Sequence, residues 1–153
     1  MSIFSIFRKK DFFSAEDKQR IVDAVRNAER MTSGEVRVFV ESRCSYIDAI
    51  DRVTELFYKF KMDRTESRNG VLVYVAMKDR QLAVFGDVNI HNKVGAEYWS
   101  AEVKKMLSNF NRNNYTEGIC EVVKDIGETL TAHFPFNNEK DKNELPDDIL
   151  FGK

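Results

Sequence analysis

An almost unbroken apolar segment near the middle of the chain constrains the fold more than any other feature. Residues 70–77 read Gly-Val-Leu-Val-Tyr-Val-Ala-Met, with valine at every second position over much of the run. A segment of this length and composition is typical of a strand buried on both faces, as happens where helices cover both sides of a sheet. The sequence therefore predicts an α/β protein with residues 71–77 as the central strand.

Two more strands are predicted around this segment. Residues 35–41 carry valines with a period of two, and residues 81–87 return along the sheet after a short polar turn. A helix predicted over residues 45–62 joins the first strand to the second, so these two should be parallel with a right-handed crossover. The tight turn makes the second and third strands antiparallel. The buried side of the connecting helix is expected to hold Ile47, Ile50, Val53, Leu56, Phe57 and Phe60.

Helical periodicity accounts for most of the remaining chain. Helices are predicted over about 14–31, 96–110 and 116–134, and a wholly polar surface loop over 63–69. Gly127 lies inside the last helix, where it is expected to allow close packing. The fold class is therefore α/β, a small mixed sheet sandwiched between helices in three layers (αβα).

Length and composition indicate one domain. The chain has 153 residues, of which 32% are charged and 42% hydrophobic, as in globular proteins. The domain is assigned to residues 14–135, with an N-terminal extension over 1–13 and a mobile C-terminal tail over 136–153. Asp148-Ile-Leu-Phe151 in this tail either docks on a partner or frays. We expect a monomer.

The charge balance excludes several function classes. With 24 basic and 25 acidic side chains, the chain lacks the basic excess that nucleic acid or anionic lipid requires. No segment approaches the ~20 apolar residues of a membrane span. The apolar start precedes its basic residues, the reverse of a secretory signal. We therefore predict a cytoplasmic protein, with Cys44 and Cys120 as free thiols.

Polar residues gather at one edge of the predicted sheet. Glu35 begins the first strand, Asn69 precedes the second and Asp87 follows the third. Because of the strand directions, all three positions fall at the same edge. Carboxylate and amide oxygens from separate loops are ligands that calcium or magnesium takes. The alternative is that Asp87 caps a following helix, Glu35 is solvated and the nearby glycines serve turns.

The opposite edge of the sheet holds a second polar cluster. Residues 41–43 and 78–80 include Arg43 and Arg80, which could hold a phosphate at the carboxyl ends of the parallel strands. The alternative is an ordinary charged hairpin tip. The chain has no P-loop, no GxGxxG, no GxSxG and no HExxH motif, so the enzyme classes that depend on them are excluded.

Three motifs in order carry a family resemblance. They are Ser33-Gly34-Glu35, Asn69-Gly-Val-Leu72 and Phe85-Gly86-Asp87, followed by Trp99 and Tyr115-Thr-Glu-Gly118. Together they resemble the TPM domain family over about residues 14–135, in a short soluble form. The resemblance implies a mixed sheet between helices. It also implies a divalent-cation site at the sheet edge, calcium more than magnesium, for which the candidates here are Glu35, Asn69 and Asp87.

Three alternative functions are open, of which the first two rest on the resemblance. The first is a binding domain with a divalent-cation site, the second a metal-dependent, acid-phosphatase-like hydrolase of phosphomonoesters, and the third a metal-free protein-interaction module. The partner would be an unidentified protein or a phosphorylated small molecule. Arg68 stands where many long members of the family have an aspartate, so metal binding should be weakened. The long forms' secretion signal and membrane anchor are not found, which argues against a membrane-tethered role.

Overall fold

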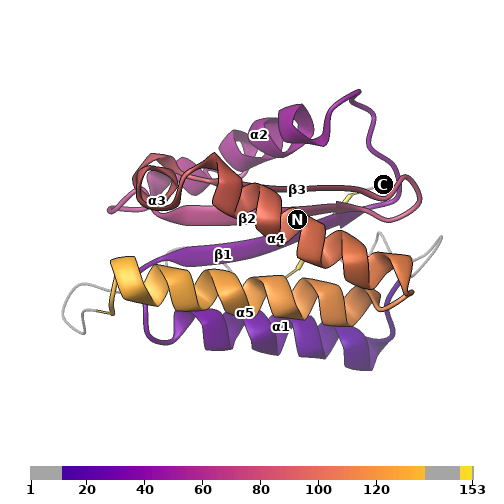
Figure 1. Ribbon diagram of the computed structural model, residues 1–153, viewed down its shortest axis with the longest axis horizontal. Helices are drawn as coiled ribbons and strands as arrows, with labels where there is room; N and C mark the ends of the chain where they lie inside the picture. The colour runs from indigo at the N-terminus through magenta and orange to yellow at the C-terminus, as the bar shows by residue number, and fades with distance from the viewer. Residues whose placement is uncertain (1–11, 137–148, 153) are drawn as a thin grey trace.

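The computed structural model describes residues 12–136 and 149–152. Within them the chain forms helices on both sides of one sheet, as Figure 1 shows. The elements in chain order are α1 (Ala15–Glu29), β1 (Glu35–Glu41), α2 (Ala49–Lys59), the 3-10 helix η2 (Met62–Arg64), β2 (Gly70–Ala76), β3 (Gln81–Gly86), α3 (Val88–Val94), α4 (Ala96–Asn111), α5 (Tyr115–His133) and β4 (Leu150–Phe151).

The sheet has the predicted strand directions. Its order is β3-β2-β1-β4, with β1 and β2 parallel and β2 and β3 antiparallel. Every residue of β1 and of β2 is buried, which confirms that the apolar run is an interior strand covered on both faces. Alternate side chains of each strand point to opposite faces of the sheet, so a separate hydrophobic core forms on each face.

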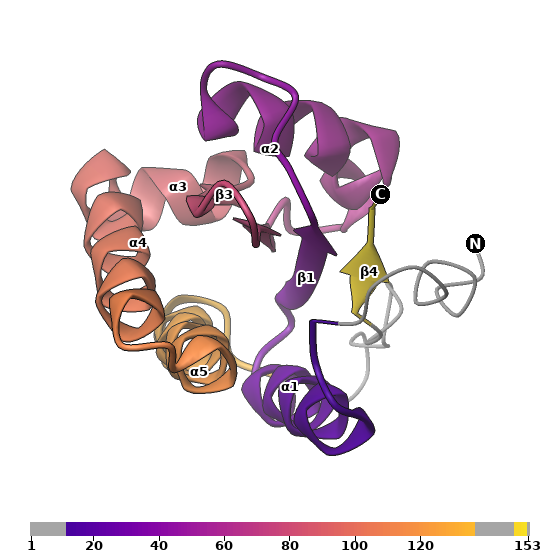
Figure 2. The ribbon, with the colours of Figure 1, turned by 90° about the vertical axis from the view of Figure 1, so that its right-hand side faces the viewer.

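The two cores make the three-layer αβα arrangement. The valines of the three long strands pack against α1, α4 and α5, while the larger side chains of the opposite face pack against α2. Figure 2, which looks along the sheet, shows α2 on one side and α1 and α5 on the other. The first core includes Val36, Val38, Val40, Val71, Val73, Val75 and Val84, and the second includes Phe39, Leu72, Tyr74, Val53 and Phe57.

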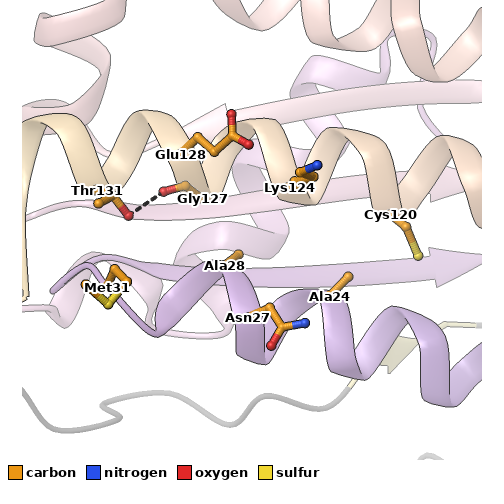
Figure 3. Close-up of a pocket in the computed structure, with 9 residues that line it drawn as sticks. All are labelled: Ala24, Asn27, Ala28, Met31, Cys120, Lys124, Gly127, Glu128 and Thr131. Atoms are coloured by element: carbon orange, nitrogen blue, oxygen red, sulfur yellow. Dashed lines mark hydrogen bonds between the residues drawn. The ribbon is translucent and has the colours of Figure 1, made fainter.

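The contact between α1 and α5 depends on a glycine. A Cβ atom added to Gly127 would lie 2.6 Å from both Cα and Cβ of Ala28, closer than carbon atoms pack. The prediction that Gly127 allows close packing is confirmed. Figure 3 shows the two residues facing each other across the helix pair.

The segment around α2 differs from the prediction at both ends. The helix begins at Ala49 rather than near residue 45, because the Asp48 carboxylate accepts a hydrogen bond from the Ile50 amide at 2.9 Å and caps it there. Ile47 therefore precedes the helix and is fully exposed, and Ile50 is half exposed, so the expectation that both are buried is wrong. The loop over 63–69 is also not wholly at the surface, because Thr65 and Asn69 are buried.

Besides η2, two elements were not predicted. The short helix α3 follows β3 directly, buries only Ile90 and is separated from α4 by Gly95, whose φ is 81°. Strand β4 pairs in parallel with Phe39 and Val40 of β1, so part of the predicted mobile tail is ordered. Residues 137–148 of that tail, and residues 1–11 of the N-terminal extension, lie outside the described residues. None of the helices in the described part of the chain is long and apolar enough to cross a bilayer.

Candidate functional site

The sheet brings the three predicted site residues to one edge. Glu35 is paired with Gly70, and Val71 with Gly86, so Asn69 and Asp87 flank the start of the β1–β2 ladder. All three side chains are almost completely buried, with 3% of Glu35, none of Asn69 and 1% of Asp87 exposed. The expectation that Glu35 is solvated, which belonged to the alternative interpretation, is wrong.

Asp87 is held by Arg68 and by the start of α3. The Arg68 guanidinium forms a two-pronged ion pair with it, Nε to Oδ2 at 2.7 Å and Nη2 to Oδ1 at 2.8 Å. Its Oδ1 also accepts from the Val88 amide at 2.7 Å, so Asp87 caps α3, as the alternative interpretation expected. The hydrogen bond to Asp87 raises the pKa of Arg68. A guanidinium therefore lies where a cation bound to this carboxylate would lie.

The loop before β2 fixes Arg68 in this position. Arg68 has a left-handed backbone, with φ of 50°. Asn89 of α3 ties the loop down, because its amide donates to the Arg68 carbonyl at 3.1 Å and its side chain donates to the Ser67 carbonyl at 2.8 Å. A non-glycine residue in this region costs of order 1–3 kcal/mol and persists where its surroundings hold it. The contacts with Asn89 therefore hold Arg68 in its position at this edge of the sheet.

Asn69 offers an oxygen that nothing in the described structure uses. Its Nδ2 donates to the Ser33 hydroxyl at 3.1 Å, and its backbone amide donates to the Thr65 hydroxyl at 3.2 Å. Its Oδ1 is buried and has no hydrogen-bond partner among the described residues. Buried polar atoms without a partner are rare in native proteins and call for an explanation such as a bound water or ion.

The donor set fits a divalent cation only in part. Two carboxylates and an amide oxygen are hard ligands, but calcium takes six to eight oxygens, so backbone carbonyls and water would have to supply the rest. Nowhere in residues 12–136 and 149–152 do three or more histidine, cysteine, aspartate or glutamate side chains form a metal-binding group. Asp87 would also have to release Arg68, whose side chain is 41% exposed.

The opposite edge of the sheet is a hydrogen-bonded hairpin tip. Arg43 pairs with Asp79 at 3.2 Å, and Arg80 donates to the carbonyl of Phe110 at the end of α4 and to the Tyr115 hydroxyl, both at 3.1 Å. Both arginines already have partners within the chain. The arrangement favours the hairpin-tip interpretation over a phosphate site.

A buried charge that was not predicted lies at this same edge. Glu41 is 4% exposed, and Arg52 of α2 binds both of its carboxylate oxygens at 2.9 Å. The Tyr74 hydroxyl also donates to Glu41, and burial together with this hydrogen bond raises the pKa of Tyr74. The one indication of this buried ion pair in the sequence was that Arg52 lies beside the apolar face of α2.

Two hollows lie beside the helices, and the second of them reaches Asp87 of the candidate site. One, of about 610 Å³, lies between α1 and α5 and is lined mainly by small side chains, together with Met31, Lys124 and Glu128 (Figure 3). The other, of about 680 Å³, runs beside β3 between α2 and α4. Trp99 lines the second hollow, and its indole N–H donates to Nδ1 of His91 at 3.0 Å. Neither hollow was identified from the sequence.

Comparison with known proteins places this three-layer domain in a family. The model of the TPM domain matches residues 6–129, so the chain belongs to the TPM domain family. The solution structure of the BA42 protein from the psychrophilic bacterium Bizionia argentinensis is similar, with 36% sequence identity and a TM-score of 0.85 over 95% of this chain and 99% of that chain.

A more distant structure shares the fold alone. It is the N-terminal domain of cg2496 from Corynebacterium glutamicum, with 11% identity and a TM-score of 0.63 over 80% of this chain and 76% of that chain. No curated protein matches this chain. The fold class and the family predicted from the sequence are thereby confirmed.

Proposed function

We propose that this chain is a TPM-family binding domain whose edge site, formed by Glu35, Asn69 and Asp87, takes a divalent cation weakly and in competition with Arg68. The observation that carries the proposal is the buried Oδ1 of Asn69, which has no partner among the described residues and lies at the edge shared by two buried carboxylates. Calcium is the better candidate than magnesium, because it tolerates irregular oxygen sets, whereas magnesium demands near-octahedral geometry.

Arg68 explains why the affinity should be low. Its guanidinium already neutralises Asp87 through two hydrogen bonds. Two like unit charges about 4 Å apart repel by about 4 kcal/mol at an effective dielectric near 20, before screening by salt, so a cation and Arg68 cannot share the carboxylate. Binding would therefore require Arg68 to move into solvent.

The same ion pair supports a second candidate, the metal-free interaction module. Here Arg68 would be the permanent counter-ion of Asp87, and the edge would be closed. Hydrolysis of phosphomonoesters has less support, since it would require the cation to activate water. His91 is bonded to Trp99 through Nδ1, and Ser33 to Asn69, so neither forms a base–nucleophile pair at the edge. The cytoplasmic location and the monomeric state stay predictions.

Arg68→Asp is expected to tighten calcium binding at least about tenfold relative to the native chain, which is about 1.4 kcal/mol. The substitution removes the competing cation and adds a carboxylate beside Asn69. Amide chemical shifts during calcium and magnesium titrations measure the affinity, and the largest shifts should fall at Glu35, Asn69 and Asp87. Asp87→Asn, which keeps a side chain able to cap α3, should abolish the gain.

Arg64→Asp is the matched control for this experiment. It makes the same change of charge at an exposed arginine, the last residue of η2, which precedes the loop that holds Arg68. If it tightens calcium binding as much as Arg68→Asp, the gain is a general effect of charge and not a property of the site. Failure of both the native chain and Arg68→Asp to bind either cation would favour the metal-free module. Chelator-sensitive hydrolysis of p-nitrophenyl phosphate would instead revive the hydrolase.

A further inference from the structure

Strand β3 forms a free edge of the sheet within the described structure. The amide of Asp87 donates to the carbonyl of Gly70 at 2.9 Å, and these two residues lie opposite each other when the β2–β3 register is extended by one pair. Hydrogen-bonded and non-hydrogen-bonded pairs alternate along an antiparallel ladder. Residues 81, 83 and 85 therefore bond to β2. Leu82, Val84 and Gly86 direct their N–H and C=O groups away from it.

The three residues lie along the hollow beside β3, where Leu82 is partly exposed and Val84 and Gly86 are buried. Leu82, Val84 and Gly86 all line the groove of about 680 Å³ between α2 and α4. No hydrogen bond joins their backbone groups to other described residues outside the sheet ladder. Backbone N–H and C=O groups require partners, and an unpaired edge supplies them in the spacing of another strand.

The walls of the groove suit apolar side chains. Ile50 and Tyr58 on α2 are 50% and 49% exposed, and Trp99 and Val103 lie on α4. Figure 2 shows β3 with α2 on one side and α4 on the other. A linear segment has no covering layers, whereas the edge of a second folded domain would bring helices of its own against α2 and α4. The geometry thus favours a linear segment over a second copy of this domain.

The charges of the groove favour an acidic residue in that segment. Asp87 lines one end but is neutralised by Arg68, and His91 is bonded to Trp99. Lys104 lines the α4 wall and is exposed. An acidic side chain beside Lys104 would complement this charge.

We propose that the β3 groove binds an extended peptide segment as an added strand, with apolar residues at alternate positions and an acidic residue beside Lys104. Main-chain hydrogen bonds to Leu82, Val84 and Gly86 hold the segment, and its entry requires the side chains that cover Val84 and Gly86, Trp99 among them, to move aside. The apolar walls select its side chains, as in other cases of strand addition. The proposal is independent of the cation site, because its contacts do not require Arg68 to leave Asp87.

Hydrogen exchange of the free protein tests the first step. The amides of Leu82, Val84 and Gly86 should exchange faster than those of Ala83, Phe85 and Asp87, since only the latter donate to β2. Equal protection of both sets would show that the edge is already covered, and would overturn the proposal.

Binding is tested with the synthetic peptide acetyl-Glu-Val-Thr-Val-Thr-Val-amide. At millimolar concentration it should slow exchange at Leu82, Val84 and Gly86 and change the fluorescence of Trp99, the one tryptophan in the chain. Two N-methylated versions of the peptide serve as a test. Each is methylated at every second residue, and the two sets of methylated residues are shifted by one, so that each version blocks the amide donors on one edge of the extended peptide. One version should bind and the other should not.

Single-residue variants test whether the peptide binds in the groove. Ile50→Asp should abolish peptide binding, while Ile47→Asp, which changes a fully exposed residue outside the groove, should leave it unchanged. Lys104→Glu should reverse the preference from the glutamate peptide to a matching lysine peptide.

Equal binding of both N-methylated versions would indicate a pocket for small apolar molecules. Peptide-induced shifts confined to Phe39 and Val40 would place binding at the other edge. No shift at all would show that the groove takes no strand, and each of these three results overturns the proposal.

Discussion

Replacing Arg52 by alanine is expected to lower the free energy of unfolding by about 3 kcal/mol, because it leaves a buried carboxylate without its counter-ion. Glu41 has 5% of its side chain exposed, and Arg52 has 17%. Both carboxylate oxygens of Glu41 accept from Arg52 at 2.9 Å. Arg52 also stacks over the ring of Phe39, 5.9 Å from its centroid, so some packing is lost as well. Urea denaturation at neutral pH measures the change.

A neighbouring ion pair gives the matched control. Arg43→Ala removes the pair with Asp79, but Arg43 is 70% exposed, and exposed pairs contribute roughly 0–1 kcal/mol. Adding Glu41→Gln to Arg52→Ala removes the buried charge and should recover part of the loss. If Arg43→Ala and Arg52→Ala destabilise the protein equally, burial is not what gives the Arg52–Glu41 pair its importance.

Replacing Glu102 by glutamine is expected to stabilise the protein at about pH 8 by roughly 2 kcal/mol and to have little effect near pH 5. Glu102 lies on α4, only 2% exposed, and its Oε2 has no hydrogen-bond partner among the described residues. Burial and the nearby carboxylate of Asp125 raise the pKa of Glu102 to about 7. Lys105 opposes this shift, with its Nζ 3.5 Å from Glu102 and 2.9 Å from Asp125.

The direction of the pH effect follows from this raised pKa. As pH rises, the unfolded chain releases the proton of Glu102 near its ordinary pKa of 4.5, whereas the folded chain keeps it to about 7. Between these values the folded state binds more protons, so the contribution of Glu102 to stability falls as pH rises. Glutamine has no proton to release, so the difference in stability between variant and native chain should grow over this window and then level off.

Glu97→Gln serves as the control for this prediction. Glu97 is exposed and lies on the same helix, so its replacement should leave the pH dependence of stability unchanged. Unfolding curves at several pH values compare the three proteins. A constant difference between Glu102→Gln and the native chain from about pH 5 to pH 8 would contradict the raised pKa of Glu102.

The sequence by itself determined the three long strands, their directions and the edge at which the candidate site residues lie. Alternating valines and a continuous apolar run are local signals, and the lengths of the two connections decide whether neighbouring strands run parallel or antiparallel. Glu35, Asn69 and Asp87 therefore reach one edge for reasons that can be read from the chain. Gly127 was also predictable, because a glycine inside a helix calls for a packing reason.

The tertiary structure alone decided which charges pair and which are buried. Arg68 binds Asp87 across 19 positions, and Arg52 binds Glu41 across 11, and each side chain had other nearby acids in the sequence. Glu102 is buried because α5 covers its face of α4, and β4 forms because a distant segment returns to β1. Such pairings depend on contacts between residues far apart in sequence, which local periodicity does not record.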